Sequence, residues 1–256
     1  MKKASVLALS LFSFLIPQTS PEPRRTIHVI VALCDNINQG IVPVPEALGN
    51  GLDPSRNLYW GARYGVKTSL KNHPDWDLVA KFENPSSAVL ERLVFKRKDA
   101  PIYLTADAYK GAEVKRAIMD FLDFAAGTAK GEIPSEAGKI GCGGNADLIC
   151  YVGHNGLMDF SLESGPAPAD AKERKAIILA CASKPYFTAL LRKTGASPLL
   201  WTTGLMSPEA YTLIAALDSW VRGEKPETTR EKAAQAYDMY QKCGIEGAKK
   251  LFATGY

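Results

Sequence analysis

Two apolar runs of the sequence end at residues that can do covalent chemistry. The run DLICYVG is followed by His154, and the run AIILAC ends with Cys181, 27 residues further along the chain. A thiolate attacks carbonyl carbon readily, and an imidazole can hold the thiol proton and deliver it to a leaving amine. We expect the backbone N–H groups of Gly156 and of Cys181 itself to bind the oxyanion of the intermediate. The pair therefore predicts a cysteine-dependent acyl-transfer site.

A second interpretation of these two residues stays open. Cysteine is among the most buried residue types, and a histidine in a glycine-rich turn often has no chemical role. His154 and Cys181 would then simply end two buried strands. The other histidines offer no better base, because His28 lies inside an expected strand and His73 lies in the loop NHPDW.

Alternating strands and helices must position these residues. Apolar runs predict strands at residues 26–36, 88–97, 100–111, 147–153, 176–181 and 197–204. Helical spacing of apolar residues and glycine or proline signals predict helices at residues 65–73, 110–127, 169–175, 188–195, 207–223 and 228–252. This order predicts an α/β fold with a mostly parallel sheet, formed by a single domain of residues 23–256.

Sites in such folds gather beyond the carboxyl ends of the strands. The first expected strand ends in Asp35 and Asn36, so we expect both near His154 and Cys181, as substrate-binding residues. The 27 residues between the histidine and the cysteine leave room for one crossover helix, which allows the two strands to be neighbours.

Two further segments are expected at the same edge. The strand 197–204 ends with Trp201 and Thr202, which we expect in the wall of a substrate pocket, and Ser207 is expected to cap the next helix. The aromatic segment NLYWGARYG in the long loop after the first strand is either a platform over the cleft or an apolar plug for the loop. We favour the plug.

The blocks ICYVGHNG and IILACAS resemble the signature of the caspase-like cysteine peptidases, which include caspases, legumains, gingipains, clostripains and separases. The strand HVIVALCDN and the helix KGAEVKRAIMDFL also fall where that fold has its first strand and second helix. The likeness covers most of residues 26–222, and only the two blocks are specific. It implies a three-layer sandwich with a mostly parallel central sheet and a peptide-cleaving dyad of His154 and Cys181. By charge pairing, Asp35 near the pocket would favour Arg or Lys before the cut.

The sequence departs from this family at two points. Asn155 separates His154 from Gly156, where the family usually has glycine directly after the histidine, and the 27-residue gap to Cys181 is shorter than usual. The inserted Asn155 favours a second hypothesis, in which the chain is a catalytically inactive caspase-like protein that acts as an exported binding or scaffold protein.

The N-terminus indicates export. Lys2 and Lys3 precede an apolar run of 13 residues, Ala4 to Ile16, and the polar segment PQTSPEPRR follows. The run is shorter than the roughly 18 to 20 residues that span a bilayer. Residues 1–22 therefore predict a signal peptide or an N-terminal anchor, and the protein is expected in the periplasm or outside the cell.

Composition narrows the partners. A net charge of +4 without a block of Lys or Arg argues against nucleic acid. Five cysteines leave at least one thiol unpaired, and no C-x-x-C or Cys/His spacing suggests a metal. GCGGN precedes a strand instead of joining a strand to a helix, so it does not predict a phosphate-binding loop. We expect a peptide or protein substrate, no cofactor, and no membrane contact beyond the N-terminus.

Overall fold

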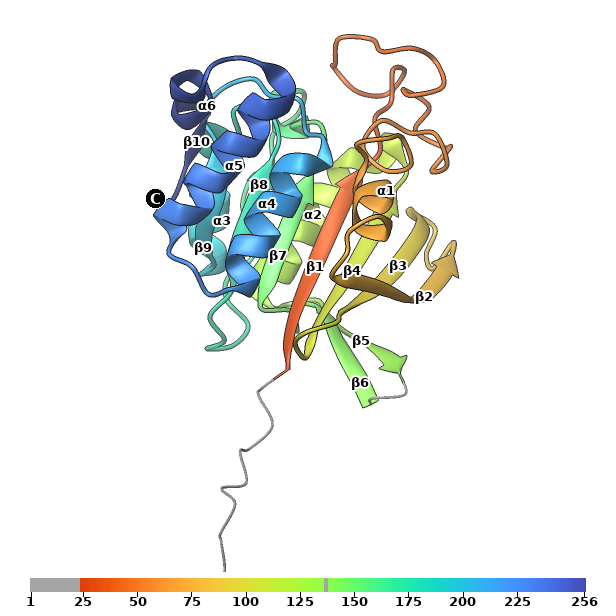
Figure 1. Ribbon diagram of the computed structural model, residues 1–256. Coiled ribbons are helices and arrows are strands. Elements are labelled where there is room, and N and C mark those ends of the chain that lie inside the picture. Colours follow the sequence, from red (N-terminus) through yellow and green to blue (C-terminus); the bar gives the residue numbers. More distant parts are fainter. Residues whose placement is uncertain (1–23, 136–137) are drawn as a thin grey trace, which may run out of the picture.

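The computed structural model describes residues 24–135 and 138–256 (Figure 1). Its centre is an eight-stranded sheet in the order β10–β9–β8–β7–β1–β4–β3–β2. Five adjacent strands run parallel, namely β1 (Arg25–Ala32), β4 (Ile102–Tyr109), β7 (Leu148–Val152), β8 (Lys175–Leu179) and β9 (Ser197–Thr202). Antiparallel strands extend both edges, namely β3 (Val89–Arg97) and β2 (Trp76–Glu83) on one side and β10 (Phe252–Ala253) on the other.

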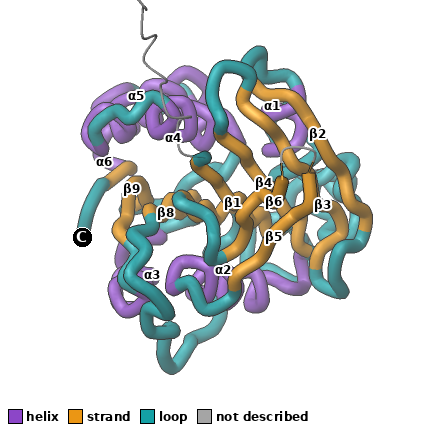
Figure 2. The backbone as a smooth tube through the Cα atoms, turned by 90° about the horizontal axis from the view of Figure 1, so that it is seen from below, coloured by secondary structure: helices purple, strands orange, loops and turns teal. Residues whose placement is uncertain are grey.

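Helices cover both faces of the sheet (Figure 2). One face carries α1 (Val66–Lys71), α4 (Ala210–Val221) and α5 (Pro226–Gln241), and the other carries α2 (Val114–Ala126) and α3 (Ser183–Thr194). The short helix α6 (Ile245–Leu251) leads into β10. The protein is therefore an α/β protein with a mostly parallel sheet flanked by helices, and this part of the sequence prediction is confirmed.

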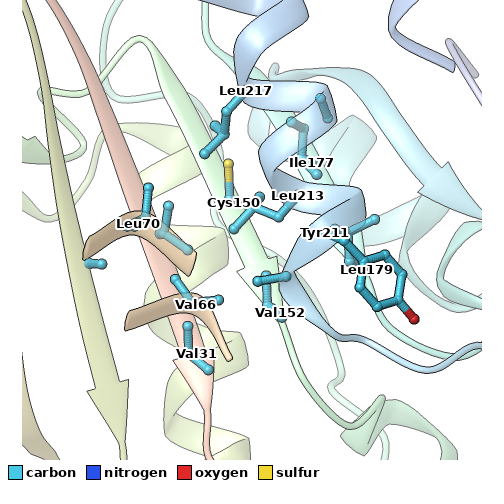
Figure 3. Close-up of a cluster of buried hydrophobic side chains, with 14 of the residues drawn as sticks. Val31, Val66, Leu70, Cys150, Val152, Ile177, Leu179, Tyr211, Leu213 and Leu217 are labelled. Carbon is cyan, nitrogen blue, oxygen red and sulfur yellow. The ribbon is translucent and has the colours of Figure 1, made fainter. Parts of the chain in front are cut away.

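Strand β7 illustrates how apolar runs fix the sheet edge. Cys150 and Val152 face the layer of α4, close to Leu213 (Figure 3), whereas Ile149 and Tyr151 face α2 and α3. All five of its residues are fully buried. A strand that buries both faces gains apolar contacts on each side, at about 25 cal/mol per Å² of area removed from water. Its end, and the turn that follows, are therefore held firmly.

Four strands lie where the sequence predicted none. Strand β2 has mostly exposed residues and hence no clear apolar pattern. Strands β5 (Lys130–Ser135) and β6 (Gly138–Gly143) form a separate hairpin from small residues. In that hairpin Ile133 and Ile140 pack on Val94 and Tyr103 of the sheet. The short β10 pairs with β9 at the end of the tail expected to be helical.

The expected helix at residues 169–175 is absent. The segment carries no regular helix and enters β8 at Lys175. The side chain of Arg174 donates to the carbonyl oxygen of Gly144 at 2.8 and 2.6 Å and pairs with Asp170 at 2.8 Å. These tertiary bonds satisfy the guanidinium in a non-helical segment, which outweighs local helix propensity.

Ser207 does not cap the helix α4. The helix begins at Ala210 with Glu209 at the N-cap position, and no side chain caps it. The backbone N–H of Ser207 instead donates to the hydroxyl oxygen of Tyr237 at 3.2 Å. This bond ties the segment between β9 and α4 to α5.

The prediction of a signal peptide or anchor at residues 1–22 falls outside the described residues. Of the helices in the described ranges, none has the length and apolar composition needed to cross a membrane.

Candidate active site

The parallel strands β7 and β8 are neighbours in the sheet (Figure 1). His154 and Cys181 follow their carboxyl ends. Val152 pairs in register with Leu179, and the N–H of Gly153 donates to the carbonyl oxygen of Leu179 at 3.2 Å. The histidine and the cysteine each lie two positions beyond this last pair. The topology therefore brings both residues to one edge of the sheet.

Asn155 joins the turns that carry these two residues. Its side-chain Nδ2 donates to the carbonyl oxygen of Cys181 at 2.7 Å, and its side-chain Oδ1 accepts from the N–H of Leu157 at 3.2 Å. Asn155 is fully buried, so these bonds are shielded from water. The residue that departs from the family pattern thus fastens the turn after β7 to the turn after β8.

A carboxylate absent from the sequence prediction contacts His154. The Nε2 atom of His154 lies 2.6 Å from Oδ2 of Asp159, and the same oxygen accepts from the N–H of Gly40 at 3.2 Å. The hydroxyl of Tyr151 donates to the carbonyl oxygen of His154 at 2.7 Å. The only sequence signal for Asp159 is its position five residues after the histidine, in the same polar turn.

The thiol of Cys181 is partly buried against the segment between β9 and α4. Its Sγ lies 3.4 Å from both the backbone N and the carbonyl O of Met206. The next residue, Ala182, adopts a left-handed conformation with φ of 46°, and its N–H donates to the carbonyl oxygen of Gly204 at 2.7 Å. The cysteine therefore occupies a sharp strand-to-helix turn that is covered by Met206.

Thr202 and Trp201 are fully buried and line no open surface. The hydroxyl of Thr202 contacts the carbonyl oxygen of Ala180 and accepts from the N–H of Ser183 at 3.0 Å. Trp201 packs against the ring of Tyr256, with ring centroids 5.6 Å apart. Thr202 therefore supports the turn that carries the cysteine, and neither residue is exposed in a pocket wall.

The donors suited to an oxyanion are not the expected pair. The N–H of Gly156 donates to the carbonyl oxygen of His154 at 3.1 Å, and Gly156 begins a short 3₁₀ turn. In the described part of the chain, the N–H groups of Asn155 and Cys181 have no hydrogen-bond acceptor. Asn155 is fully buried, whereas Cys181 is partly exposed, so the N–H of Cys181 is the donor of the expected pair that stays available.

Asp35 and Asn36 organise the loop that follows β1. The carboxylate of Asp35 accepts from the N–H groups of Ile37 and Asn38 at 2.9 and 3.1 Å, and also from the Asn38 amide at 2.9 Å. The amide of Asn36 exchanges two bonds with the backbone of Val44, at 2.8 and 3.0 Å. Asp35 is only 4% exposed, so its charge serves the loop rather than an open pocket.

The aromatic segment of this loop packs inward. Trp60 and Tyr59 are buried, and the indole N–H of Trp60 donates to the carboxylate of Glu91. Asn57 holds the loop to the end of β1 by bonding the N–H and the carbonyl of Cys34, at 3.0 and 2.8 Å. The segment therefore anchors the loop, as an apolar plug does.

All five cysteines are free thiols. Burial raises the pKa of Cys34 to about 11, against a smaller lowering by the hydroxyl of Tyr59. Burial likewise raises the pKa of Cys142, and it raises the pKa of Cys150 strongly. Since the thiolate is the reactive form, these three are protonated and unreactive near neutral pH. The thiols open to solvent are Cys181, in part, and Cys243.

Three hollows in the surface are lined by residues other than His154, Asp159 and Cys181, and one of about 610 Å³ lies between α2 and residues 161–166, which follow Asp159 in the chain. Another, of about 540 Å³, lies between α1 and the helices α4 and α5, and a third, of about 420 Å³, lies between strands β2, β3 and β4 and the hairpin β5–β6. Within the described ranges, no group of three or more His, Cys, Asp or Glu side chains is arranged to hold a metal ion. Comparison of the chain with protein-family models, curated proteins and solved structures gives no match.

Proposed function

We propose that the protein is an exported cysteine hydrolase that cleaves peptide bonds in a peptide or protein substrate. The observation that carries the proposal is the placement of His154 and Cys181 after adjacent parallel strands, with Asn155 joining their turns. We propose the finer, caspase-like form of the fold on the same grounds. It is supported by the order of histidine and cysteine along the chain and by the helices on both faces of a mostly parallel sheet.

In the proposed reaction the thiol proton of Cys181 passes to His154, and the thiolate attacks the carbonyl carbon of the substrate. A carbon–sulfur bond forms, and the carbonyl oxygen becomes an oxyanion that the N–H of Cys181 binds. Protonated His154 then gives its proton to the amine nitrogen as the carbon–nitrogen bond breaks. Water hydrolyses the resulting thioester, which releases the acid and restores the thiol.

The test is the rate at which a small haloacetamide alkylates Cys181, measured for each cysteine peptide by mass spectrometry at pH 7 and pH 9. An isolated thiol with a pKa near 8.5 reacts about 25-fold more slowly at pH 7 than at pH 9. For Cys181 in the wild type we expect the alkylation rate at pH 9 to exceed the rate at pH 7 by less than about 3-fold. In His154→Ala this ratio should return towards about 25-fold, because the imidazole no longer holds the proton. The exposed Cys243 is an internal reference in every sample.

The enzyme proposal would be contradicted if the ratio of the pH 9 and pH 7 alkylation rates of Cys181 equals that of Cys243 and does not change in His154→Ala. If the ratio behaves as expected, hydrolysis of a peptide library is measured next, with Cys181→Ser as the control. The serine variant is expected to lose at least about 10³-fold in rate.

The alternative function is a binding or scaffold protein with the same fold and without catalysis. It is favoured by the covered thiol at Met206 and by the His154 side chain, which is only 5% exposed. An inert Cys181, together with unchanged partner binding by Cys181→Ser, would support this alternative.

A further inference from the structure

We infer that Asp159 is a positioning residue for His154, so that the site is a triad of Cys181, His154 and Asp159 and not a dyad. This inference rests on the proposed function. Asp159 orients the imidazole and stabilises its charged form, and it touches neither substrate nor the reacting atoms. It also links the site to the loop after β1.

The contact fixes which ring nitrogen is free. Oδ2 of Asp159 lies 2.6 Å from Nε2 of His154, and an ionised carboxylate can only accept. Nε2 of the neutral ring therefore carries the proton, and Nδ1 has the lone pair. In the described residues Nδ1 has no hydrogen-bond partner. It is thus the nitrogen that can take the proton of the thiol.

The local turn brings the carboxylate back to its own histidine. The N–H of Asp159 donates to the carbonyl oxygen of Gly156 at 2.9 Å, and the N–H of Met158 donates to that of Asn155 at 3.0 Å. A Cβ at Gly156 would lie 2.7 Å from the ring of Phe160, so a larger residue there would have to displace that ring. The turn therefore specifies the approach of Asp159 to His154.

The loop after β1 also holds the Asp159 carboxylate in place. Gly40, in the loop after β1, donates its N–H to Oδ2 of Asp159 at 3.2 Å. A Cβ at Gly40 would lie 2.5 Å from the other carboxylate oxygen, so the backbone of the loop packs directly against the Asp159 side chain. The loop that Asp35 and Asn36 organise thus has a function in the site, although neither residue reaches it.

The electrostatic role follows from the neighbours of His154. Asp159 is the only acidic side chain in the described chain that forms an ion pair with this ring. Titratable groups on the elements packed nearby include Tyr151 of β7, whose hydroxyl binds the His154 carbonyl, and Cys181 after β8. Lys115 of α2 lies 5.7 Å from the ring of Phe160, in the same turn as Asp159. When the imidazole takes the thiol proton, the carboxylate stabilises the resulting cation and so favours the thiolate.

The first experiment identifies the tautomer of His154 in the full chain by long-range ¹H–¹⁵N spectra of the imidazole rings. The chain has three histidines, so His28→Gln and His73→Gln variants assign the signals. We expect His154 protonated at Nε2 at neutral pH. A His154 ring protonated at Nδ1 would overturn the inference, whatever the reactivity of the cysteine.

The second experiment compares the pH 7 to pH 9 alkylation ratio of Cys181 in Asp159→Asn. The amide keeps the shape and can still accept from Nε2, while the charge is lost. We expect the rate at pH 7 to fall at least about 3-fold relative to pH 9. The control is Glu163→Gln, an exposed carboxylate on the same loop, which is expected to match the wild type.

Gly40→Ala provides a check that leaves the carboxylate in the chain. Its added methyl group must displace the Asp159 side chain, so the ratio should shift in the same direction as in Asp159→Asn. A wild-type ratio in both variants would contradict the positioning role. A wild type that itself reacts like a free thiol would refute the proposed hydrolase, and the tautomer measurement would then decide the inference alone.

Discussion

The carboxylate of Asp107, inside the sheet, has no part in the candidate site but dominates the buried electrostatics. It accepts two bonds of 2.7 Å from Arg92 and lies 3.1 Å from Nε2 of His28, whose Nδ1 accepts from the N–H of Gly143 at 2.7 Å. Burial alone would raise the pKa of Asp107, but these partners hold it below its ordinary value, Arg92 before His28. A carboxylate with a lowered folded-state pKa stabilises the protein above its ordinary pKa near 3.9, and this contribution is lost as the pH falls through the folded-state value.

Asp107→Asn is therefore expected to lower the free energy of unfolding at pH 7 by about 3 to 5 kcal/mol, because the guanidinium of Arg92 loses its charge partner. Urea unfolding measures the change. The difference in free energy of unfolding between variant and wild type should begin to narrow below about pH 4, where the carboxylate of the unfolded chain is protonated. It should continue to narrow as the pH falls through the lower folded-state pKa of Asp107. As a control, Asp53→Asn breaks an exposed ion pair with Arg56 and should cost less than about 1 kcal/mol. A gap that stays constant with pH would exclude this account of Asp107.

At the scale of elements, the turns after β7 and β8 depend on one amide. Asn155→Ala removes the side-chain donor to the carbonyl oxygen of Cys181 and leaves this oxygen without that hydrogen bond. We expect a loss of stability of about 1 to 3 kcal/mol, together with a Cys181 alkylation ratio closer to that of Cys243. Thr128→Val, which removes a hydroxyl bond to Asp123 in the turn after α2, tests whether any loosened turn has this effect. It should leave the ratio unchanged.

The segment between β9 and α4 controls access to the thiol. Met206 covers Cys181, and the neighbouring Ser207 is held by the hydroxyl of Tyr237 on α5. Tyr237→Phe removes that bond while keeping the ring, so we expect the alkylation rate of Cys181 to rise about 2- to 10-fold at every pH. Tyr240→Phe on the same helix is the matched control. An unchanged rate in Tyr237→Phe would mean that the segment covers the thiol without this bond.

The elements that the sequence predicted well are those with a strong local signal. The continuous apolar runs of β1, β7, β8 and β9 and the amphipathic repeat of α2 are visible in the sequence. Gly127 ends α2, as expected, and the structure shows it in a left-handed conformation. The hairpin β5–β6 and the strand β2 were missed because their stability comes from contacts with distant strands. The same holds for the site, since the bonds of Asp159 to Gly40 and of Asn155 to Cys181 join segments far apart in sequence.

At the scale of the whole molecule, one core runs the width of the sheet. The cluster under α1, α4 and α5 contains Trp76 and Phe95 at one side and Leu200 and Phe252 at the other, all buried. It also includes residues of β1 and β7, which connect the two sides. An uninterrupted core couples the strands energetically, because no part can unfold without exposing apolar surface of its neighbour.

This continuity predicts a single cooperative unfolding transition. Phe95→Ala on β3 and Leu200→Ala on β9 each leave a cavity in the same core, and each should lower the free energy of unfolding by about 2 to 5 kcal/mol. In both variants the midpoints from circular dichroism and from tryptophan fluorescence should coincide, since tryptophans lie on both sides, in β2 and in β9. Two separate midpoints, with each substitution shifting only one, would instead divide the chain into two independent folding units. The turns that carry His154 and Cys181 follow β7 and β8, two inner strands of the same sheet, so both substitutions should speed alkylation of Cys181 only once global unfolding begins.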